Sequence, residues 1–260
     1  MKNIKKLLLL SLCSINILFV NCSKEQDSQG NTSLQEKDSI PLTDYGFYHN
    51  EALDLYYNNH QSLSGKTTNL IIDEMSTELK KKYPKEFEDV NINDIKIAFK
   101  NIDPQHFDID TFWNSNKEEL YASNKVSKRL GGLVDKILEN NMNYNQYIIE
   151  IENFKSSSSS KKANPLTIEE QNNLVVLESV LKSSNQYWNS QSAPTKKLTG
   201  KAGSKVIVAD TMGALMFVYS GPMSIICGGL CSLFVNEALP PLQIPIDDLP
   251  PFQFPIEEEI

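Results

Sequence analysis

Histidine and aspartate residues gather in one short segment, where they could bind a metal ion. The segment contains an imidazole and three carboxylates, at Asp103, His106, Asp108 and Asp110, and these are ligand types that divalent cations accept. It lacks a glycine for the turn, and its spacing does not match a calcium-binding loop. We therefore expect a solvated acidic loop, and keep a divalent-cation site at these four residues as the weaker alternative.

The remaining residue types capable of catalysis do not form a recognisable set. The chain has three histidines, and His49 and His60 are eleven residues apart, which is about 16 Å along a helix and too far for one metal ion. The sequence contains no GxSxG, P-loop, HExxH or GxGxxG motif. We therefore name no catalytic residue and no cofactor, and favour a function other than catalysis, which nothing in the sequence excludes.

Cys227 and Cys231 are four residues apart in an apolar, glycine-rich stretch with no histidine beside them. On a helix, this spacing places both on one face in a geometry poorly suited to a disulfide. A metal or redox site would need more ligands than the neighbourhood offers. We expect both side chains to be small buried hydrophobic groups.

Cys22 follows a segment with the pattern of an export signal. Three lysines stand among the first six residues, an uncharged apolar run covers residues 7–20, and a polar stretch begins at Ser23. This junction resembles the lipobox of bacterial lipoproteins, in which the first mature residue is a lipid-modified cysteine. The resemblance implies that residues 1–21 are a signal peptide and that acylated Cys22 holds the protein in a lipid bilayer. A plain secretory signal and an uncleaved anchor are the alternatives, although the apolar run is short for a bilayer about 30 Å thick.

The net charge of the chain bears on its possible partners, and the residues after Cys22 bear on its cellular location. Without residues 1–21 the chain has 22 basic against 33 acidic residues, a formal charge of −11, so nucleic acid is not an expected partner. Glu25 and Asp27 resemble the export tags that send some Bacteroidota lipoproteins to the cell surface. This second resemblance implies the outer membrane or cell surface of a Gram-negative bacterium.

Residues 22–42 are polar and predict a flexible tether, and residues 43–190 predict a helical domain. Apolar spacing predicts helices over 45–59, 68–83 (ended by Pro84) and 145–154, while 92–99 fits either helix or strand. Two capping boxes predict helix starts. One is Ser115–Glu118, opening a long helix that Gly131-Gly132 interrupts, and the other is Thr167–Glu170, opening a helix with an apolar stripe through Trp188.

A linker over 191–205 precedes the most apolar part of the chain, residues 206–236. Asp210 is the single charged residue there, and Gly221-Pro222 divides the segment into two helix-length halves, which predicts a helical hairpin. Small residues recur at every fourth position, including Gly213 and Gly228, a spacing that allows two helices to approach closely. We favour burial of this hairpin inside the domain over insertion into a membrane, because each half is short for spanning.

Residues 237–260 form an acidic, Pro-rich tail that contains a tandem decamer repeat. Residues 239–248 and 249–258 are identical at six of ten positions, and the tail holds half of the twelve prolines. Such a segment favours an extended, polyproline-like backbone that can dock against aromatic side chains. An unknown protein partner, packing onto the chain's own domain and a disordered tail are the alternatives. The candidate partner-binding residues are Leu239, Pro240, Pro241, Leu249, Pro250 and Pro251.

Scattered positions over residues 45–236 also resemble a group of uncharacterised Bacteroidota lipoproteins. They are His49-Asn50 with Leu53-Asp54, then Thr167–Glu170 leading to Ser184, Tyr187 and Trp188, and finally Asp210 with Gly213. The resemblance implies no activity. Together these observations predict a mostly α-helical lipoprotein with a bundle-like domain, a C-terminal hydrophobic hairpin and an extended tail. We expect a non-enzymatic binding or interaction module, and the alternative is a membrane-active, bacteriocin-like protein that inserts residues 206–236.

Overall fold

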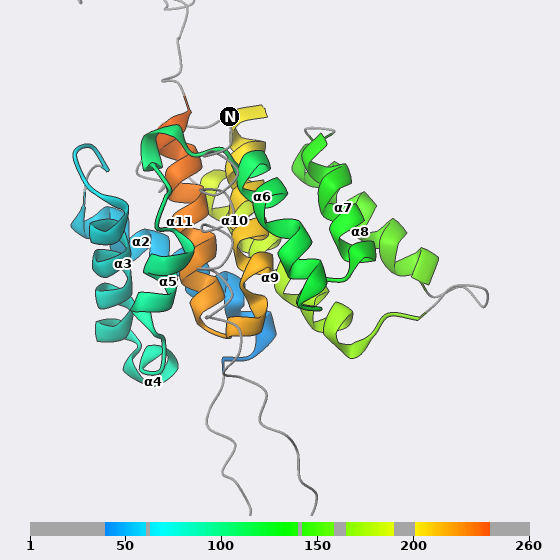
Figure 1. The fold of residues 1–260 in the computed structure, drawn as a ribbon, viewed down its shortest axis with the longest axis horizontal. Coiled ribbons are helices and arrows are strands. Elements are labelled where there is room, and N and C mark those ends of the chain that lie inside the picture. Colours follow the sequence, from blue (N-terminus) through cyan, green and yellow to red (C-terminus); the bar gives the residue numbers. More distant parts are fainter. Residues whose placement is uncertain (1–39, 61–62, 140–141, 159–164, 190–200, 240–260) are drawn as a thin grey trace, which may run out of the picture. The chain divides into compact units, whose positions relative to one another are not determined.

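The computed structural model describes residues 40–60, 63–139, 142–158, 165–189 and 201–239. Within these residues the regular structure is helical throughout and contains no strand, which confirms the predicted mostly α fold (Figure 1). The predicted signal peptide, Cys22, most of the tether and the tail from Pro240 onward lie outside the described residues. The elements are η1 (Leu42–Asp44), α2 (Tyr45–Asn59), α3 (Thr68–Lys82), α4 (Pro84–Phe87), α5 (Ile92–Ala98), η2 (Pro104–His106), α6 (Ile109–Ala122), α7 (Lys128–Glu139), α8 (Tyr144–Ser158), α9 (Ile168–Asn189), α10 (Lys201–Met216), η3 (Val218–Ser220) and α11 (Met223–Ala238).

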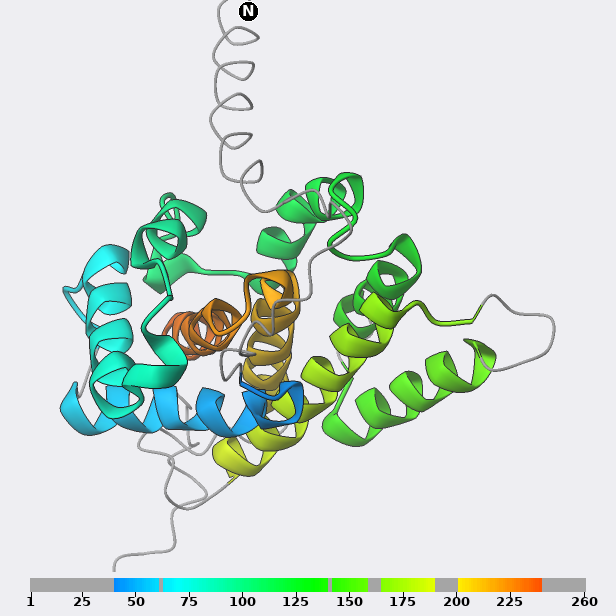
Figure 2. The same ribbon diagram turned by 90° about the horizontal axis from the view of Figure 1, so that it is seen from below.

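The predicted hydrophobic hairpin is formed by α10 and α11, which contact each other along their lengths. Figures 1 and 2 show them side by side, with α2 and α3 packed against α11 and with α9 packed against α10. Every residue from Val206 to Phe217 and from Met223 to Val235 is buried. Gly221, with φ of 60°, lets the chain reverse between the two helices. The hairpin is therefore the interior of the folded unit, as predicted.

Among the described helices, none combines the length and the apolar character that crossing a bilayer requires.

α2 and α9 form because each has an apolar stripe at helical spacing. In α2, which has the predicted limits, Ala52, Leu53 and Tyr56 are fully buried with His49 on the same stripe. In α9 the buried stripe runs from Leu174 through Ser184 to Trp188. Polar residues thus occupy core positions in both helices, which requires a polar partner inside.

The prediction that a helix begins at Ser115 was wrong. Asp108 is the N-cap of α6, because its Oδ1 accepts a hydrogen bond from the Thr111 N–H at 2.8 Å. Ser115 lies inside α6 and donates its hydroxyl to the Thr111 carbonyl at 2.8 Å. The capping-box pattern at Ser115–Glu118 is therefore a chance match inside a helix that begins at Ile109.

The break in the predicted long helix also falls elsewhere. α6 ends at Ala122, Asn124 adopts a left-handed conformation with φ of 54°, and α7 restarts at Lys128. The Gly131-Gly132 pair lies within α7. A Cβ at Gly131 would stand 1.9 Å from the Tyr121 hydroxyl oxygen, so this glycine makes room for a side chain of α6 rather than ending a helix.

Three smaller differences concern helix ends. Pro84 ends α3 and at once begins α4, where a missing N–H costs nothing. The ambiguous segment, residues 92–99, is helical as α5, and α8 extends four residues beyond its predicted end, to Ser158. α10 starts at Lys201, so the last five residues of the predicted linker are helical.

Candidate functional site

Asp210 is the single charged residue of the hairpin, and it lies at the centre of a buried polar cluster. Its Oδ1 lies 2.6 Å from Nε2 of His49, which belongs to α2. Its Oδ2 accepts hydrogen bonds from the Ser184 hydroxyl and, at 2.8 Å, from the Trp188 indole N–H, both on α9. All four residues are buried, and both charged side chains are 0% exposed. We call these four residues the Asp210 cluster.

The hydrogen bonds of His49 determine its charge state. Asn50 donates its Nδ2 to the Ser183 carbonyl at 2.9 Å, which leaves its Oδ1 facing Nδ1 of His49 at 3.2 Å. Both ring nitrogens therefore face acceptors, and this arrangement requires the doubly protonated imidazolium. Burial lowers the pKa of His49, but the charge and hydrogen bond of Asp210 and the bond to Asn50 outweigh it, so the pKa is raised.

The Asp210 cluster has the residue types of a hydrolase triad but not its connectivity. A catalytic serine must donate to the histidine that will remove its proton. Here Ser184 and His49 both donate to the same carboxylate, and Nδ1 of His49 faces Asn50. The arrangement neutralises a buried charge and ties α2, α9 and α10 together. Both effects stabilise the fold.

Small residues allow the hairpin helices to approach closely around this cluster. A Cβ at Gly228 would lie 2.9 Å from the Asp210 carbonyl oxygen and 3.3 Å from the His49 ring. A Cβ at Gly213 would lie 2.8 Å from the Cys227 carbonyl oxygen. The predicted small-residue contact is therefore present at these two positions.

Cys227 and Cys231 are free and buried, as expected. Burial raises the pKa of both thiols well above the usual value, which leaves them protonated and unreactive at neutral pH.

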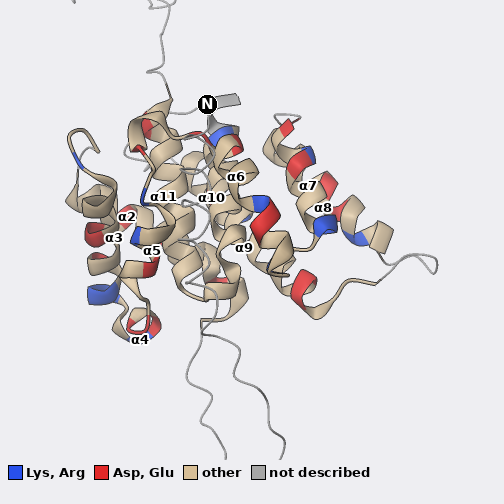
Figure 3. Ribbon diagram, viewed as in Figure 1, with Lys and Arg blue, Asp and Glu red and all other residues tan. Residues whose placement is uncertain are grey.

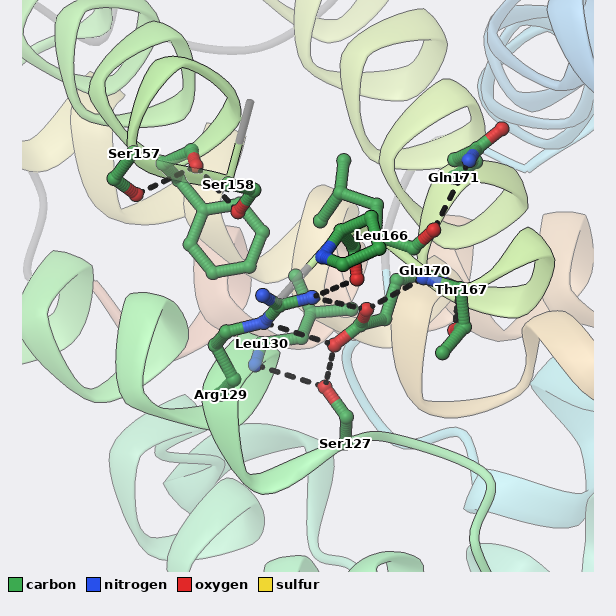
Figure 4. A network of polar contacts seen from close by, with 11 residues as sticks. Ser127, Arg129, Leu130, Ser157, Ser158, Leu166, Thr167, Glu170 and Gln171 are labelled. Atoms are coloured by element: carbon green, nitrogen blue, oxygen red, sulfur yellow. Dashed lines mark hydrogen bonds and ion pairs between the residues drawn. The ribbon is translucent and has the colours of Figure 1, made fainter. Parts of the chain in front are cut away.

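A second polar cluster joins the starts of α7 and α9 (Figure 4). Glu170, 4% exposed, accepts hydrogen bonds from the Arg129 guanidinium, from the Ser127 hydroxyl at 2.6 Å and from the Thr167 N–H at 2.9 Å. Thr167 Oγ1 accepts from the Glu170 N–H at 3.1 Å, which confirms the predicted capping box. Burial alone would raise the pKa of Glu170, but these hydrogen bonds and the charge of Arg129 lower it to about 2. We call this the Glu170 cluster.

The four candidate metal ligands do not converge. Asp103 contacts the His106 ring at 2.7 Å and accepts from the Gln105 N–H, while Asp108 caps α6. Asp110 belongs to the first turn of α6. Within the residues that the structure describes, no three or more His, Cys, Asp or Glu side chains are arranged to hold a metal ion.

An apolar cavity between α7, α8, α9 and α10 is small. Tyr147, Leu177, Val208 and Met212 contribute to its lining, and its volume is about 10 Å³. This is about the room that one water molecule needs. The cavity as it stands is too small for a substrate.

The structure brings together residues that were known only as scattered points of resemblance. His49 and Asp210 are 161 residues apart in the chain, so neither helical periodicity nor local motifs could pair them. A buried charge needs a polar partner. The sequence signal for the pair was therefore a lone aspartate in an apolar hairpin together with a histidine in an apolar stripe. Of the candidate tail residues, Leu239 is described, and it packs against the core; the other five lie outside the described residues.

No protein-family model, curated protein or solved structure matches this chain.

Proposed function

We propose that this chain is a membrane-anchored lipoprotein whose helical body serves as a non-enzymatic interaction module. The observation that best supports this proposal is the burial of the hairpin formed by α10 and α11. The most apolar segment of the chain lies inside the folded unit, and its one charge is neutralised there by α2 and α9. A body built in this way is a fixed scaffold, and its outer surface is what meets other molecules.

The proposed location of the protein at a membrane rests on the lipobox-like pattern that ends at Cys22. Acylated Cys22 is proposed as the anchor and residues 22–42 as the tether, at the outer membrane or cell surface of a Gram-negative bacterium. Each buried methylene of an acyl chain contributes about 0.8 kcal/mol, so more than one chain on Cys22 gives a lasting anchor. The Pro-rich tail is proposed as a segment that recognises a protein partner through its leucines and prolines.

Mass spectrometry of the native protein tests the anchor. We expect a mature amino terminus at Cys22 that carries fatty acid, and release from the membrane fraction on Cys22→Ser. Cys13→Ser changes a cysteine within the apolar run and is the matched control, which should remain anchored. A terminus elsewhere, or a Cys22 without lipid, would remove the anchor from the proposal.

One observation favours the membrane-active alternative. Every residue of α11 from Met223 to Val235 is buried and none is charged, so this helix has no charged face to carry into lipid. Dye release from liposomes separates the two functions. The interaction module predicts intact liposomes from pH 5 to pH 8, whereas leakage that Asp210→Asn increases would support insertion of the hairpin.

A further inference from the structure

An exposed aromatic patch lies where the first turn of α2 meets the end of α3. It consists of Phe47, Tyr48 and Tyr83, and Phe47 is 54% exposed. The ring centroids of Phe47 and Tyr48 are 5.1 Å apart, as are those of Tyr48 and Tyr83, both edge to face. Beneath them Phe87 is fully buried against Tyr48. The rings are thus fixed by packing while part of their surface remains open to solvent.

Lysines flank Tyr83 of this aromatic patch in the sequence. Four of the six residues from Lys80 to Lys85 are lysines. Three of them, Lys80, Lys81 and Lys82, form the last turn of α3, which is blue in Figure 3. Lys82 Nζ lies 5.3 Å from the centre of the Tyr83 ring and pairs with Glu51, while Lys81 and Lys85 are exposed. Glu86 and Asp44 lie near Tyr48, and Glu51 accepts a hydrogen bond from the Tyr83 hydroxyl. The lysine rim, which we define as Lys81, Lys82 and Lys85, is therefore mixed with acidic groups.

The chain leaves α11 in a conformation that points to what this patch binds. Leu239 has φ of −70° and ψ of 135°, which are polyproline-like values. Its side chain packs against the core, and its N–H donates to the Val235 carbonyl at 3.0 Å. The first residue of the decamer repeat is therefore already extended and in contact with the body.

The aromatic patch is within reach of the rest of the tail. Asn236 donates its Nδ2 to the Tyr57 hydroxyl at 3.1 Å, so α11 ends beside the last part of α2. Phe47 lies ten residues earlier on that helix, about 15 Å along its axis. A polyproline conformation of the 21 residues after Leu239 would span about 65 Å.

We propose that the Pro-rich tail, residues 240–260, docks on the aromatic patch of its own chain. Prolines of the second repeat stack on Phe47 and Tyr83, as extended proline-rich segments do on aromatic surfaces. The acidic residues at the end of each repeat, Asp247-Asp248 and Glu257-Glu258, meet the lysine rim. Among possible occupants, the tail of the same chain is held nearby at high effective concentration. Docking of this kind withholds the tail from an outside partner until that partner competes for it. The proposal deepens the proposed role of the tail but needs neither lipid nor partner.

Photocrosslinking in the full chain, purified in mild detergent, tests the docking. With p-benzoylphenylalanine in place of Phe252, we expect crosslinks within one molecule to residues 44–51 or 80–87. Phe47→Ala should lower their yield about fivefold, and the matched control Ile149→Ala, which truncates a 57% exposed residue of α8, should not. The double variant Lys81→Glu with Lys85→Glu should also lower the yield, while Lys100→Glu, at another exposed lysine, should leave it unchanged.

Crosslinks that map elsewhere, join two molecules or ignore Phe47→Ala would overturn the docking. Loss of liposome binding on Phe47→Ala without any intramolecular crosslink would assign the patch to a membrane instead. Because Cys22→Ser should leave the crosslink intact, failure of the lipid anchor and failure of the docking are distinguishable.

Discussion

The Asp210 cluster and the Glu170 cluster solve the same problem in two different settings. Each places one carboxylate among at least three donors and ties helices together. In the Asp210 cluster every partner is buried, and the cluster lies in the apolar centre. In the Glu170 cluster the Arg129 side chain is 35% exposed, and the cluster joins two helix starts at the surface.

The difference lies in what can replace a lost partner. Water can reach Arg129 when Glu170 is changed, so the stranded charge is partly solvated. Water cannot reach the cluster when Asp210 is changed, so His49 must give up its proton and the donors that faced the carboxylate lose their charged acceptor in an apolar interior. Three donor residues at each carboxylate therefore imply a larger cost at the centre than at the surface.

The largest effect is expected from Asp210→Asn. This change keeps the shape of the side chain but removes the charge that pairs with His49, and it should lower the free energy of unfolding by about 3–5 kcal/mol. Urea unfolding followed by circular dichroism measures it. Glu118→Gln, at an exposed residue of α6, is the control and should change the free energy of unfolding by less than about 0.5 kcal/mol. An equally small loss at Asp210 would contradict the role given to the cluster.

A smaller effect, about 2 kcal/mol, is expected from Glu170→Gln, because its partners are partly solvated. The pKa of Glu170 is about 2 in the folded protein and about 4.5 when unfolded. The stabilisation is therefore present above pH 4.5 and is lost as the pH falls toward 2. Urea unfolding from pH 7 to pH 2.5 should show that Glu170→Gln removes this part of the acid sensitivity. Glu169→Gln, at the exposed neighbour, should retain it.

Two glycines near the clusters should respond with opposite sign. Gly228→Ala places a methyl group 2.9 Å from the Asp210 carbonyl oxygen and should destabilise by about 1 kcal/mol, after the gain in helix propensity. A Cβ at Gly132 meets nothing within 4 Å, so Gly132→Ala should stabilise α7 by up to about 1 kcal/mol. Thermal unfolding of both variants checks this. Stabilisation by both would mean that the hairpin is less tightly packed than described.

The smallest effect concerns the protonation of His49. Because its pKa is raised in the folded protein, the contribution of its charge is present below the unfolded pKa, about 6.5. It is lost as the pH rises through the folded value. The loss is partial, since Nε2 still donates to Asp210 after deprotonation. His49→Gln should flatten this alkaline decline in urea unfolding, whereas His60→Gln should not, and equal slopes in all three proteins would argue that His49 is neutral.

Local pattern predicted much of this fold. The limits of α2, the capping box of α9 and the buried hairpin followed from apolar spacing, turn residues and composition. The start of α6 did not, because Asp108 caps that helix and the Ser115–Glu118 pattern was met inside it. The break after Ala122 depends on Asn124 in a left-handed conformation. The presence of an asparagine does not by itself predict that conformation, so the sequence did not locate the break.

The Asp210 cluster was beyond local pattern altogether. Its members come from three helices, with His49 and Asp210 separated by 161 positions. The lone charge of the hairpin required a partner but did not say which. Only the packing of α2 against α9 and α11, and of α9 against α10, supplies that information.

Hydrogen exchange of the backbone amides in α10 and α11 tests the central claim most directly. If the hairpin is the interior scaffold, amides of residues 206–217 and 223–235 should exchange only with global unfolding, and lipid vesicles should not change their rates. Fast exchange in these residues without lipid, or protection that appears only when vesicles are added, would contradict the account.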